Sequence, residues 1–422
     1  MAVVGALLLW TTAALPGGAA LAAGTPSPYA FAPGARSVTG GTGTTDAVPL
    51  TPGSTYRSSL PGDARTYYSL ELDAASDVYV SATALPAPGN TIRAGDGIKV
   101  SVEDSDGRSC SSGAAGTKTF GIVSTPRPLA AWGAREISAK RPRCRTAGTY
   151  YVTVERVSTT TSVPDTWDLE LFATSEPPLK QAGATTAPGD WDSASPAPLT
   201  GEAVRREGGA GFASAEPIGN GVWNSDLEPG RTLFYKVPLD WGRRLYATAE
   251  LGSSNSGTGN TGGALNLSLY NPVRGFVDDD GVTYDGRQKT AELDPLPPVT
   301  YENRYAGPAP LSAMRFAGSY YLVVHLAADV AEKYGEGPFP LTLRVRLEGA
   351  AQAAPGYAGQ PEPRGVIQGG TDDWGTAAGG GPGSGGDAAM TVLAVSGIGA
   401  GTVLLAVLGV WTVMARRRAG AL

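Results

Sequence analysis

The chain contains two copies of one sequence pattern, and this internal repeat restricts its fold more than any other feature. The strongest match joins residues 147–152 (AGTYYV) to residues 317–322 (AGSYYL), 170 positions later. A nearly constant offset over ordered matches predicts two domains of one fold in tandem. The other matched pairs, in chain order, are 49–50 with 217–218, 56–62 with 223–230, 67–70 with 234–237, 78–80 with 245–247, and 98–102 with 265–269.

The matched segments have the pattern of β-strands. Apolar residues alternate with polar ones at 98–102 and 265–269, and again at 169–171 and 341–345. A period of two indicates a sheet with one buried face. Pro-Gly and Asp-Gly pairs separate the runs, as turns do between short strands. The expected fold class is therefore all-β, with two tandem β-sandwich domains of the jelly-roll type.

Composition sets the expected boundaries of the domains. We expect one sandwich at residues 46–175 and the second at 211–349, joined by a linker at 176–210 that is rich in Pro, Ala, Gly and Ser. Residues 350–387 are rich in Gly and Pro and predict a flexible stalk, with a root-mean-square reach of roughly 30–40 Å. Trp191, inside the linker, is a candidate to dock on a domain.

Both ends of the chain predict a membrane protein. Residues 1–23 have an apolar stretch and an Ala-x-Ala site, as a cleaved signal peptide does, although no Lys or Arg precedes the stretch. The alternative is an uncleaved anchor. Residues 388–415 carry no charge and are long enough to be a transmembrane helix. Arginines open the tail at 416–422, which predicts a single-pass type I protein of the cell membrane, mostly extracellular.

Two glycines in the predicted transmembrane helix suggest a contact between helices. Gly397 and Gly401 are four residues apart, a spacing that lets two helices approach closely. They are therefore candidate residues for a homodimer. The alternative is that small residues are simply common in such helices.

The repeated motifs resemble those of the bacterial pre-peptidase C-terminal domain family. In the first copy the likeness rests on the Leu-Pro-Gly turn at 60–62, the alternating strand and Asp-x-Asp-Gly turn at 100–107, and the closing strand at 147–152. The second copy has Asn271-Pro272 in place of the acidic turn. The resemblance covers half to two-thirds of the chain. It implies β-sandwiches that are noncatalytic appendages of secreted enzymes, although this chain carries no peptidase.

The chain has two cysteines, Cys110 and Cys144. An even number in an exported chain predicts one disulfide, and two free thiols are the alternative. Cys110 follows the Asp-Gly turn of the first copy, and Cys144 precedes its closing strand. The second copy has no cysteine, so the expected role of the bridge is structural.

Four carboxylates of the second copy are a candidate metal site. Asp278, Asp279 and Asp280 are consecutive, and Asp285 lies nearby. Oxygen-rich turns suit Ca²⁺, which takes roughly six to eight hard ligands. The alternative is a solvated turn, because Asp favours turns by bonding to the backbone. A weaker acidic turn lies at 103–106, and no other cofactor is implied.

The residue inventory argues against most catalysis and against nucleic acid. The net charge is −6, which disfavours binding to the negatively charged backbone of nucleic acid. His325 is the single histidine, so a zinc site built from several histidines is impossible and a Ser-His-Asp triad would need this residue. We expect His325 on the outward face of a strand. A pair of carboxylates, as in glycosidases, stays open.

These observations predict a noncatalytic cell-surface protein that binds an extracellular protein or a cell-wall glycan. One alternative is an accessory subunit of a membrane or secretion complex, and a second is a hydrolase with an unrecognised carboxylate site. Exposed aromatics would stack on sugars or join a protein interface. Most tyrosines lie in predicted strands, where core packing or cross-strand pairing is expected. Examples are Tyr67, Tyr150, Tyr151, Tyr320 and Tyr321.

Overall fold

A computed structural model describes residues 29–368, except 63, 89, 112–115, 122–124, 139–142, 159–164 and 198. The predicted signal peptide, transmembrane helix and tail lie outside the described residues, as do Gly397 and Gly401. Within the described part of the chain, no helix is both long and apolar enough to span a bilayer.

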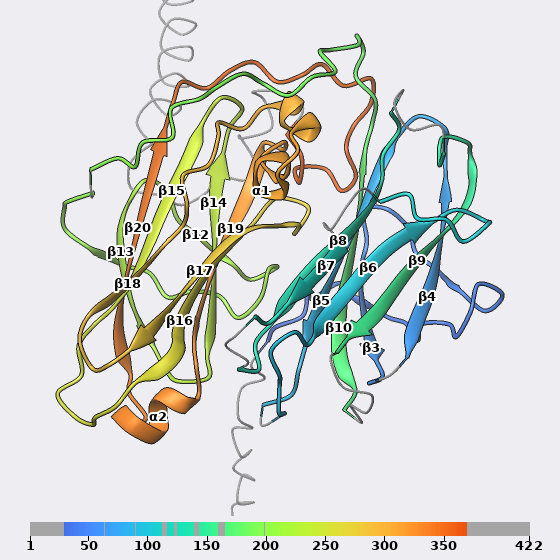
Figure 1. The fold of residues 1–422 in the computed structure, drawn as a ribbon. Coiled ribbons are helices and arrows are strands. Elements are labelled where there is room, and N and C mark those ends of the chain that lie inside the picture. The colour runs from blue at the N-terminus through green and yellow to red at the C-terminus, as the bar shows by residue number, and fades with distance from the viewer. Residues whose placement is uncertain are drawn as a thin grey trace, which may run out of the picture.

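The first domain is a sandwich of two five-stranded sheets (Figure 1). Sheet 1 has the order β2-β4-β9-β6-β7, and sheet 2 has the order β1-β3-β10-β5-β8. The strands are β1 (Arg36–Ser37), β2 (Val48–Pro49), β3 (Thr55–Leu60), β4 (Arg65–Leu72), β5 (Asp77–Leu85), β6 (Gly97–Glu103), β7 (Thr117–Thr119), β8 (Leu129–Arg135), β9 (Gly148–Val157) and β10 (Trp167–Glu176).

The second domain repeats this topology strand by strand, which confirms the tandem β-sandwiches. Sheet 3 has the order β12-β14-β19-β16-β17, and sheet 4 has the order β11-β13-β20-β15-β18. The strands are β11 (Val204–Arg205), β12 (Glu216–Pro217), β13 (Gly221–Leu227), β14 (Thr232–Leu239), β15 (Arg244–Leu251), β16 (Thr261–Tyr270), β17 (Phe276–Tyr284), β18 (Lys289–Glu292), β19 (Gly318–Leu326) and β20 (Phe339–Glu348), with helices η2 (Tyr301–Tyr305), α1 (Ala309–Ala313) and α2 (Asp329–Tyr334).

The sheets extend beyond the expected domain boundaries. Strand β1 lies before residue 46 and pairs in parallel with β3, and β11 lies inside the predicted linker and pairs in parallel with β13. Each is two residues long. Strands this short cannot show an alternating pattern, so sequence periodicity does not reveal them.

The strongest repeat motif has the same structural role in both cores. Tyr150 and Tyr320 are buried, and each donates its hydroxyl proton to the carbonyl oxygen four residues earlier, at 2.8 Å and 2.9 Å. Each ring thereby enters its core while its polar end stays satisfied. The expectation of core tyrosines is confirmed here.

The predicted disulfide is confirmed. Cys110 and Cys144 are bonded, with their Cα atoms 5.7 Å apart and a sequence separation of 34. The backbone of Cys110 also donates to Val102 at the end of β6, at 2.7 Å. The bridge therefore ties the segment before β9 to the C-terminal end of the neighbouring strand β6.

Replacing Cys110 and Cys144 together by serine is expected to lower the free energy of unfolding by about 4 kcal/mol, because the unfolded chain regains the entropy of an open loop. Urea unfolding of the double variant measures this loss. Reduced wild-type protein should unfold at the same urea concentration as the variant. Equal midpoints for oxidised wild type and the double variant would contradict the prediction.

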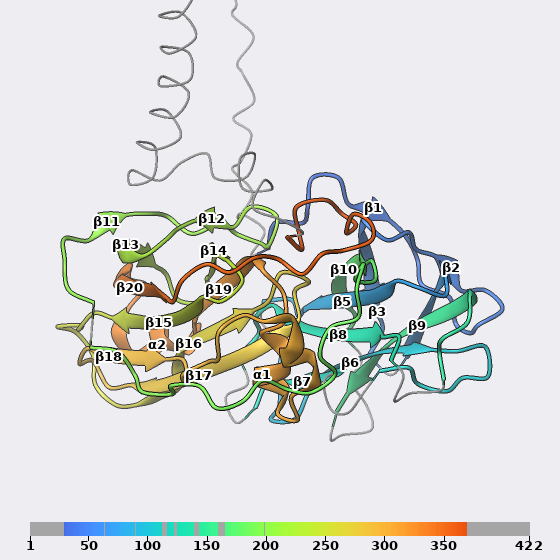
Figure 2. The ribbon, with the colours of Figure 1, turned by 90° about the horizontal axis from the view of Figure 1, so that it is seen from above.

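The two sandwiches pack face to face, so that the four sheets stack in the order 1, 2, 3, 4 (Figures 1 and 2). Sheet 2 contributes Tyr79 and Trp132 to this interface. Tyr79 meets Phe316 of the second domain edge to face, with ring centroids 5.0 Å apart. A second aromatic cluster holds Phe234 of sheet 3 together with Tyr29 from the start of the described chain. The outer faces of sheets 2 and 3 are thus both covered.

Ion pairs also cross the interface. Several of these pairs are almost fully buried, so charged side chains of both domains are removed from water. The pairs are Glu170 with Arg274, Asp77 and Glu176 with Arg304, Glu136 with Arg315, and Asp279 with Lys118.

The first part of the predicted stalk is not a free tether. Tyr357 and Ile367 are buried against the domain interface. Isolated bridges join Leu179 to Tyr357 and Ser175 to Glu362, so residues 350–368 run beside the start of the linker. The sequence missed this because Gly- and Pro-rich composition predicts flexibility, whereas a few apolar side chains are enough to dock such a segment.

Candidate ligand-binding site

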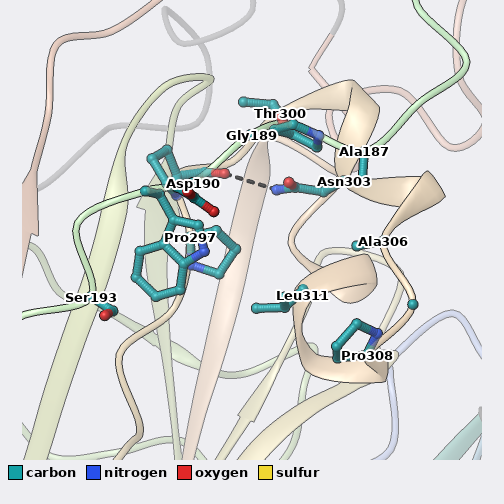
Figure 3. A pocket seen from close by; sticks show the side chains of 14 residues that line it. Ala187, Gly189, Asp190, Ser193, Pro297, Thr300, Asn303, Ala306, Pro308 and Leu311 are labelled. Atoms are coloured by element: carbon teal, nitrogen blue, oxygen red, sulfur yellow. Dashed lines mark hydrogen bonds between the residues drawn. The ribbon is translucent and has the colours of Figure 1, made fainter.

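A cavity of about 680 Å³ lies between the linker and an insertion in the second domain (Figure 3). The linker supplies one wall with residues 187–193, and the segment from Pro297 to Leu311 supplies the other. This size is within the range of pockets that hold small ligands. The cavity is therefore the candidate site.

The insertion wall has a rigid shape because prolines and one buried amide define it. Pro297 and Pro298 precede η2, and Pro308 caps the N-terminus of α1. The Asn303 side chain is buried, and its Nδ2 group donates to the carbonyl oxygens of Pro298 at 2.8 Å and Met314 at 2.7 Å. Asn303 thus uses both amide protons to hold the loop rather than to meet a ligand.

The linker wall brings an aromatic ring to the cavity. Trp191 is half-buried there, and the sequence had marked it as a candidate to dock. Arg244, at the start of β15, donates to the carbonyl oxygen of Asp192, which fixes the backbone next to Trp191. Trp191 therefore presents a flat apolar surface from a wall that is anchored to domain two.

Few polar groups face the cavity. Thr300 Oγ1 is buried and has no hydrogen-bond partner among the described residues. A buried hydroxyl without a partner is unfavourable, so a ligand that offers it a hydrogen bond gains affinity. Of the described lining residues, Asp190 alone carries a charge. Such a lining suits a neutral ligand with an apolar face and hydroxyl groups.

The four predicted Ca²⁺ ligands do not come together. Asp278 and Asp280 accept backbone protons from Asp294 at 3.0 Å and Glu292 at 2.9 Å. The other two are held by lysines: Asp279 by Lys118 of domain one, and Asp285 by Lys289. Asp279 points away from Asp278 and Asp280 because neighbouring side chains of strand β17 point to opposite faces, and Asp285 lies beyond the end of this strand. No cluster of three or more metal-ligating side chains occurs in the described parts of the chain.

His325 is on the outer face of its strand, as expected, but that face is covered by domain one. The ring is buried, with Nδ1 2.9 Å from Thr232 Oγ1 and Nε2 3.4 Å from Thr125 Oγ1 of the other domain. Burial, and then the charge of Arg127, lowers the pKa of His325 to about 3. The histidine therefore packs at the interface and lies away from the cavity.

Acidification is expected to destabilise the fold through His325. The unfolded histidine takes up a proton below its ordinary pKa of about 6.5, whereas the folded one stays neutral down to a pKa of about 3. The stability it contributes is present above pH 6.5 and is lost as pH falls, by roughly 2 kcal/mol at pH 5. Urea unfolding of wild type and His325→Gln at pH 5 and pH 7 tests this. Parallel pH profiles for the two proteins would contradict it.

Several residues of the site and interface carry no sequence signal. Glu170 lies between two leucines of β10, as an ordinary solvent-facing strand residue does, and Glu176 ends the strand after Thr174 and Ser175. Thr300 and Asn303 lie outside any motif. The segment between β18 and β19 is longer than the one between β8 and β9, but the matched motifs on either side keep nearly the same offset, so the sequence comparison gave no sign of the insertion.

No protein-family model matches the chain, and no curated protein matches it either. Similar solved structures exist at low identity. The N-terminal CBM22-1-CBM22-2 tandem domain from Paenibacillus barcinonensis Xyn10C is 11% identical, over 73% of this chain and 95% of that one, with a TM-score of 0.19. The CUB1-EGF-CUB2 domain of human MASP-1/3 is 10% identical, over 69% and 99%, with a TM-score of 0.18.

A Paenibacillus xanthan lyase is similar over 68% of this chain and 23% of its own, at 10% identity and a TM-score of 0.18. All three scores are too low to support an inference about function. The function therefore has to be argued from the geometry of this chain.

Proposed function

We propose that the protein is a noncatalytic cell-surface receptor whose tandem sandwiches bind a glycan in the cavity lined by Trp191. In this proposal the predicted signal peptide exports the chain and the predicted helix at 388–415 anchors it. The two sandwiches then form one extracellular binding unit.

The cavity lining is the observation that carries the proposal. A sugar ring has an apolar face of C–H groups and an edge of hydroxyls. Trp191 and the prolines supply an apolar surface, and Thr300, whose buried hydroxyl has no hydrogen-bond partner among the described residues, lines the same cavity. One carboxylate, Asp190, lines the described part of the cavity, whereas glycosidases use two. These features support binding without hydrolysis.

The composition of the surface supports a glycan over a protein partner. Interfaces with protein partners usually include contiguous exposed apolar side chains. Among the residues that the structure describes, Val204 is the one exposed large hydrophobic side chain. A polar glycan that binds in a cavity therefore fits this surface better than a protein partner that needs an exposed apolar patch.

Trp191→Ala is expected to weaken glycan binding at least about 30-fold, the effect of losing a contact worth about 2 kcal/mol at the centre of a site. The measurement is affinity electrophoresis of the outer region, residues 24–387, in gels that contain soluble cell-wall polysaccharides, one polysaccharide per gel. Retardation of wild type on at least one gel, lost in the variant, is the expected result.

Two further variants make the test specific. Trp191→Phe keeps an aromatic surface and should keep most of the binding. Thr300→Val keeps the shape of the cavity but removes the hydroxyl, and should weaken binding about fivefold. Circular dichroism of each variant should match wild type, because none of these side chains belongs to a sheet. Retardation of Trp191→Ala equal to wild type would refute the assignment of the site.

A further inference from the structure

A second cavity lies under the same linker. Its volume is about 360 Å³, and it separates the linker from the outer face of sheet 4. The linker covers it with Pro196, Ala197 and Leu199, and β15 and β20 form its floor. Sheet 4 is the last layer of the stack, so no other sheet covers this face.

The two cavities follow one another along the same pair of segments. Linker residues 187–191 and 193 line the first cavity, and Pro196, Ala197 and Leu199 line the second. On the opposite side, Pro297 to Leu311 line the first, and Thr290 to Leu293 line the second. A ligand long enough to follow the linker would therefore meet both cavities in sequence.

The second cavity repeats the chemistry of the first. Tyr246 supplies an aromatic ring, as Trp191 does in the first cavity. Thr248 Oγ1 is buried and, within the described chain, has no hydrogen-bond partner, which is also true of Thr300 Oγ1. Each lining thus includes one aromatic ring and one threonine whose buried hydroxyl has no hydrogen-bond partner among the described residues.

The charged groups of the second cavity are largely paired with one another. Arg344 donates to both carboxylate oxygens of Glu250, at 2.7 Å and 3.2 Å. Arg344 and Arg346 also donate to the carbonyl oxygens of Leu199 and Ala197, at 2.7 Å and 2.8 Å. These arginines therefore hold the linker through its backbone, and the paired charges do not demand a charged ligand.

We propose that the two cavities are consecutive subsites for one neutral oligosaccharide, with the linker as their shared wall. This inference rests on the proposed function and adds that the ligand is a chain of several sugar units. A disaccharide occupies the Trp191 subsite alone. A longer chain also reaches Tyr246 and Thr248, so affinity increases with chain length.

The test uses ladders of two to six units of β-1,4-linked gluco-oligosaccharides, β-1,4-linked N-acetylgluco-oligosaccharides and manno-oligosaccharides, titrated calorimetrically into residues 24–387. For the ladder that binds, affinity should increase about tenfold or more between two and six units. Thr248→Val and Tyr246→Ala should weaken binding of the hexamer about tenfold and leave binding of the dimer unchanged. Trp191→Ala should weaken both.

Thr342→Val is the matched control. Thr342 is on the same face of sheet 4, paired with Glu250 on the neighbouring strand, but it does not line the cavity. Its variant should bind every oligosaccharide as wild type does. A Thr248→Val effect equal to that of Thr342→Val would overturn the second subsite.

The outcomes separate the two proposals. Equal affinity for dimer and hexamer, with loss of both in Trp191→Ala, overturns the second subsite and leaves the glycan site in place. No binding of any oligosaccharide, together with no retardation by polysaccharides, overturns both. Recovery of shortened oligosaccharides would overturn the noncatalytic role, and would point to Glu250 and Glu292, the two carboxylates of the second cavity.

Discussion

Replacing Glu170 by alanine is expected to lower the free energy of unfolding by about 5 kcal/mol, because it leaves a buried arginine without its counter-ion. Glu170 is completely buried, and Arg274 Nη1 of the second domain lies 2.5 Å from its Oε1 atom. The same carboxylate accepts the Tyr29 hydroxyl at 3.0 Å and the Ala32 backbone N–H at 2.7 Å. One side chain therefore joins both domains and the N-terminal segment.

Urea unfolding measures the loss, and a double variant identifies its cause. Glu170→Met with Arg274→Met removes both charges and fills similar volume, so it should recover most of the lost stability. Arg65→Ala is the control, since its partner Glu155 lies on the outer face of sheet 1 and their side chains are 40% and 23% exposed. It should cost less than about 1 kcal/mol. A Glu170→Ala cost equally small would mean that the interface does not form in solution.

Arg304→Ala is expected to be similarly damaging, about 4–5 kcal/mol at pH 8, because two buried carboxylates lose one shared cation. Arg304 Nη1 lies 3.1 Å from Asp77, and its Nη2 lies 2.7 Å from Glu176. Glu176 also accepts the hydroxyls of Tyr79 and Tyr357, both at 2.7 Å. Arg304 thus connects domain one, domain two and the docked segment that contains Tyr357.

The loss should depend on pH. Burial, and then the nearby Glu176, raises the pKa of Asp77 to about 7. A carboxyl with a raised pKa in the fold contributes stability at low pH and loses it as pH rises through that pKa. At pH 5 Asp77 is protonated and needs Arg304 less, so the variant should lose less stability there than at pH 8. Urea unfolding at both pH values tests this, and a larger loss at pH 5 would contradict it.

The repeat predicted both sandwiches because each core needs apolar residues at every second position. It could not predict which outer faces meet. Tyr67 and Phe234 have equivalent positions, opposite Thr153 and Val323 on the neighbouring strand. Tyr67 is half-exposed on sheet 1, whereas Phe234 is fully buried under domain one. Alternation assigns a residue to the outer face of its sheet, and only the packing of domains decides whether that face meets water.

The sequence singled out one residue of the candidate site, Trp191, as able to dock on a domain, but it predicted no binding site there. The insertion that opposes Trp191 was hidden by compensating changes in length. Strand β18 ends 157 positions after the end of β8, so up to this point the second copy is shorter than the first. Strand β19 begins 170 positions after the start of β9, so the insertion restores the offset to nearly the value of the earlier motifs. Comparing the copies strand by strand, rather than end to end, would reveal the added segment.

The divergence of the two copies also has a physical reason at the interface. Where the first copy has an exposed acidic turn, the second has Asn271-Pro272 followed by Arg274, which has a positive φ of 61°. Asn271 Oδ1 accepts the backbone N–H of Gly275 at 2.8 Å and holds this turn in shape. The turn that departs most from the repeat is thus the one that delivers the arginine to Glu170.

The docked segment 350–368 can detach and extend when a force pulls on its C-terminal end. It leaves the second sandwich after β20 and folds back along the linker, where isolated bridges hold it instead of a continuous ladder. A pull on its C-terminal end would detach these contacts one after another, before it loads the hydrogen bonds between strands. Fully extended, the 19 residues of this segment span roughly 65 Å. In a chain anchored by the proposed helix at 388–415, release of this segment would let the two sandwiches move away from the membrane by less than this length.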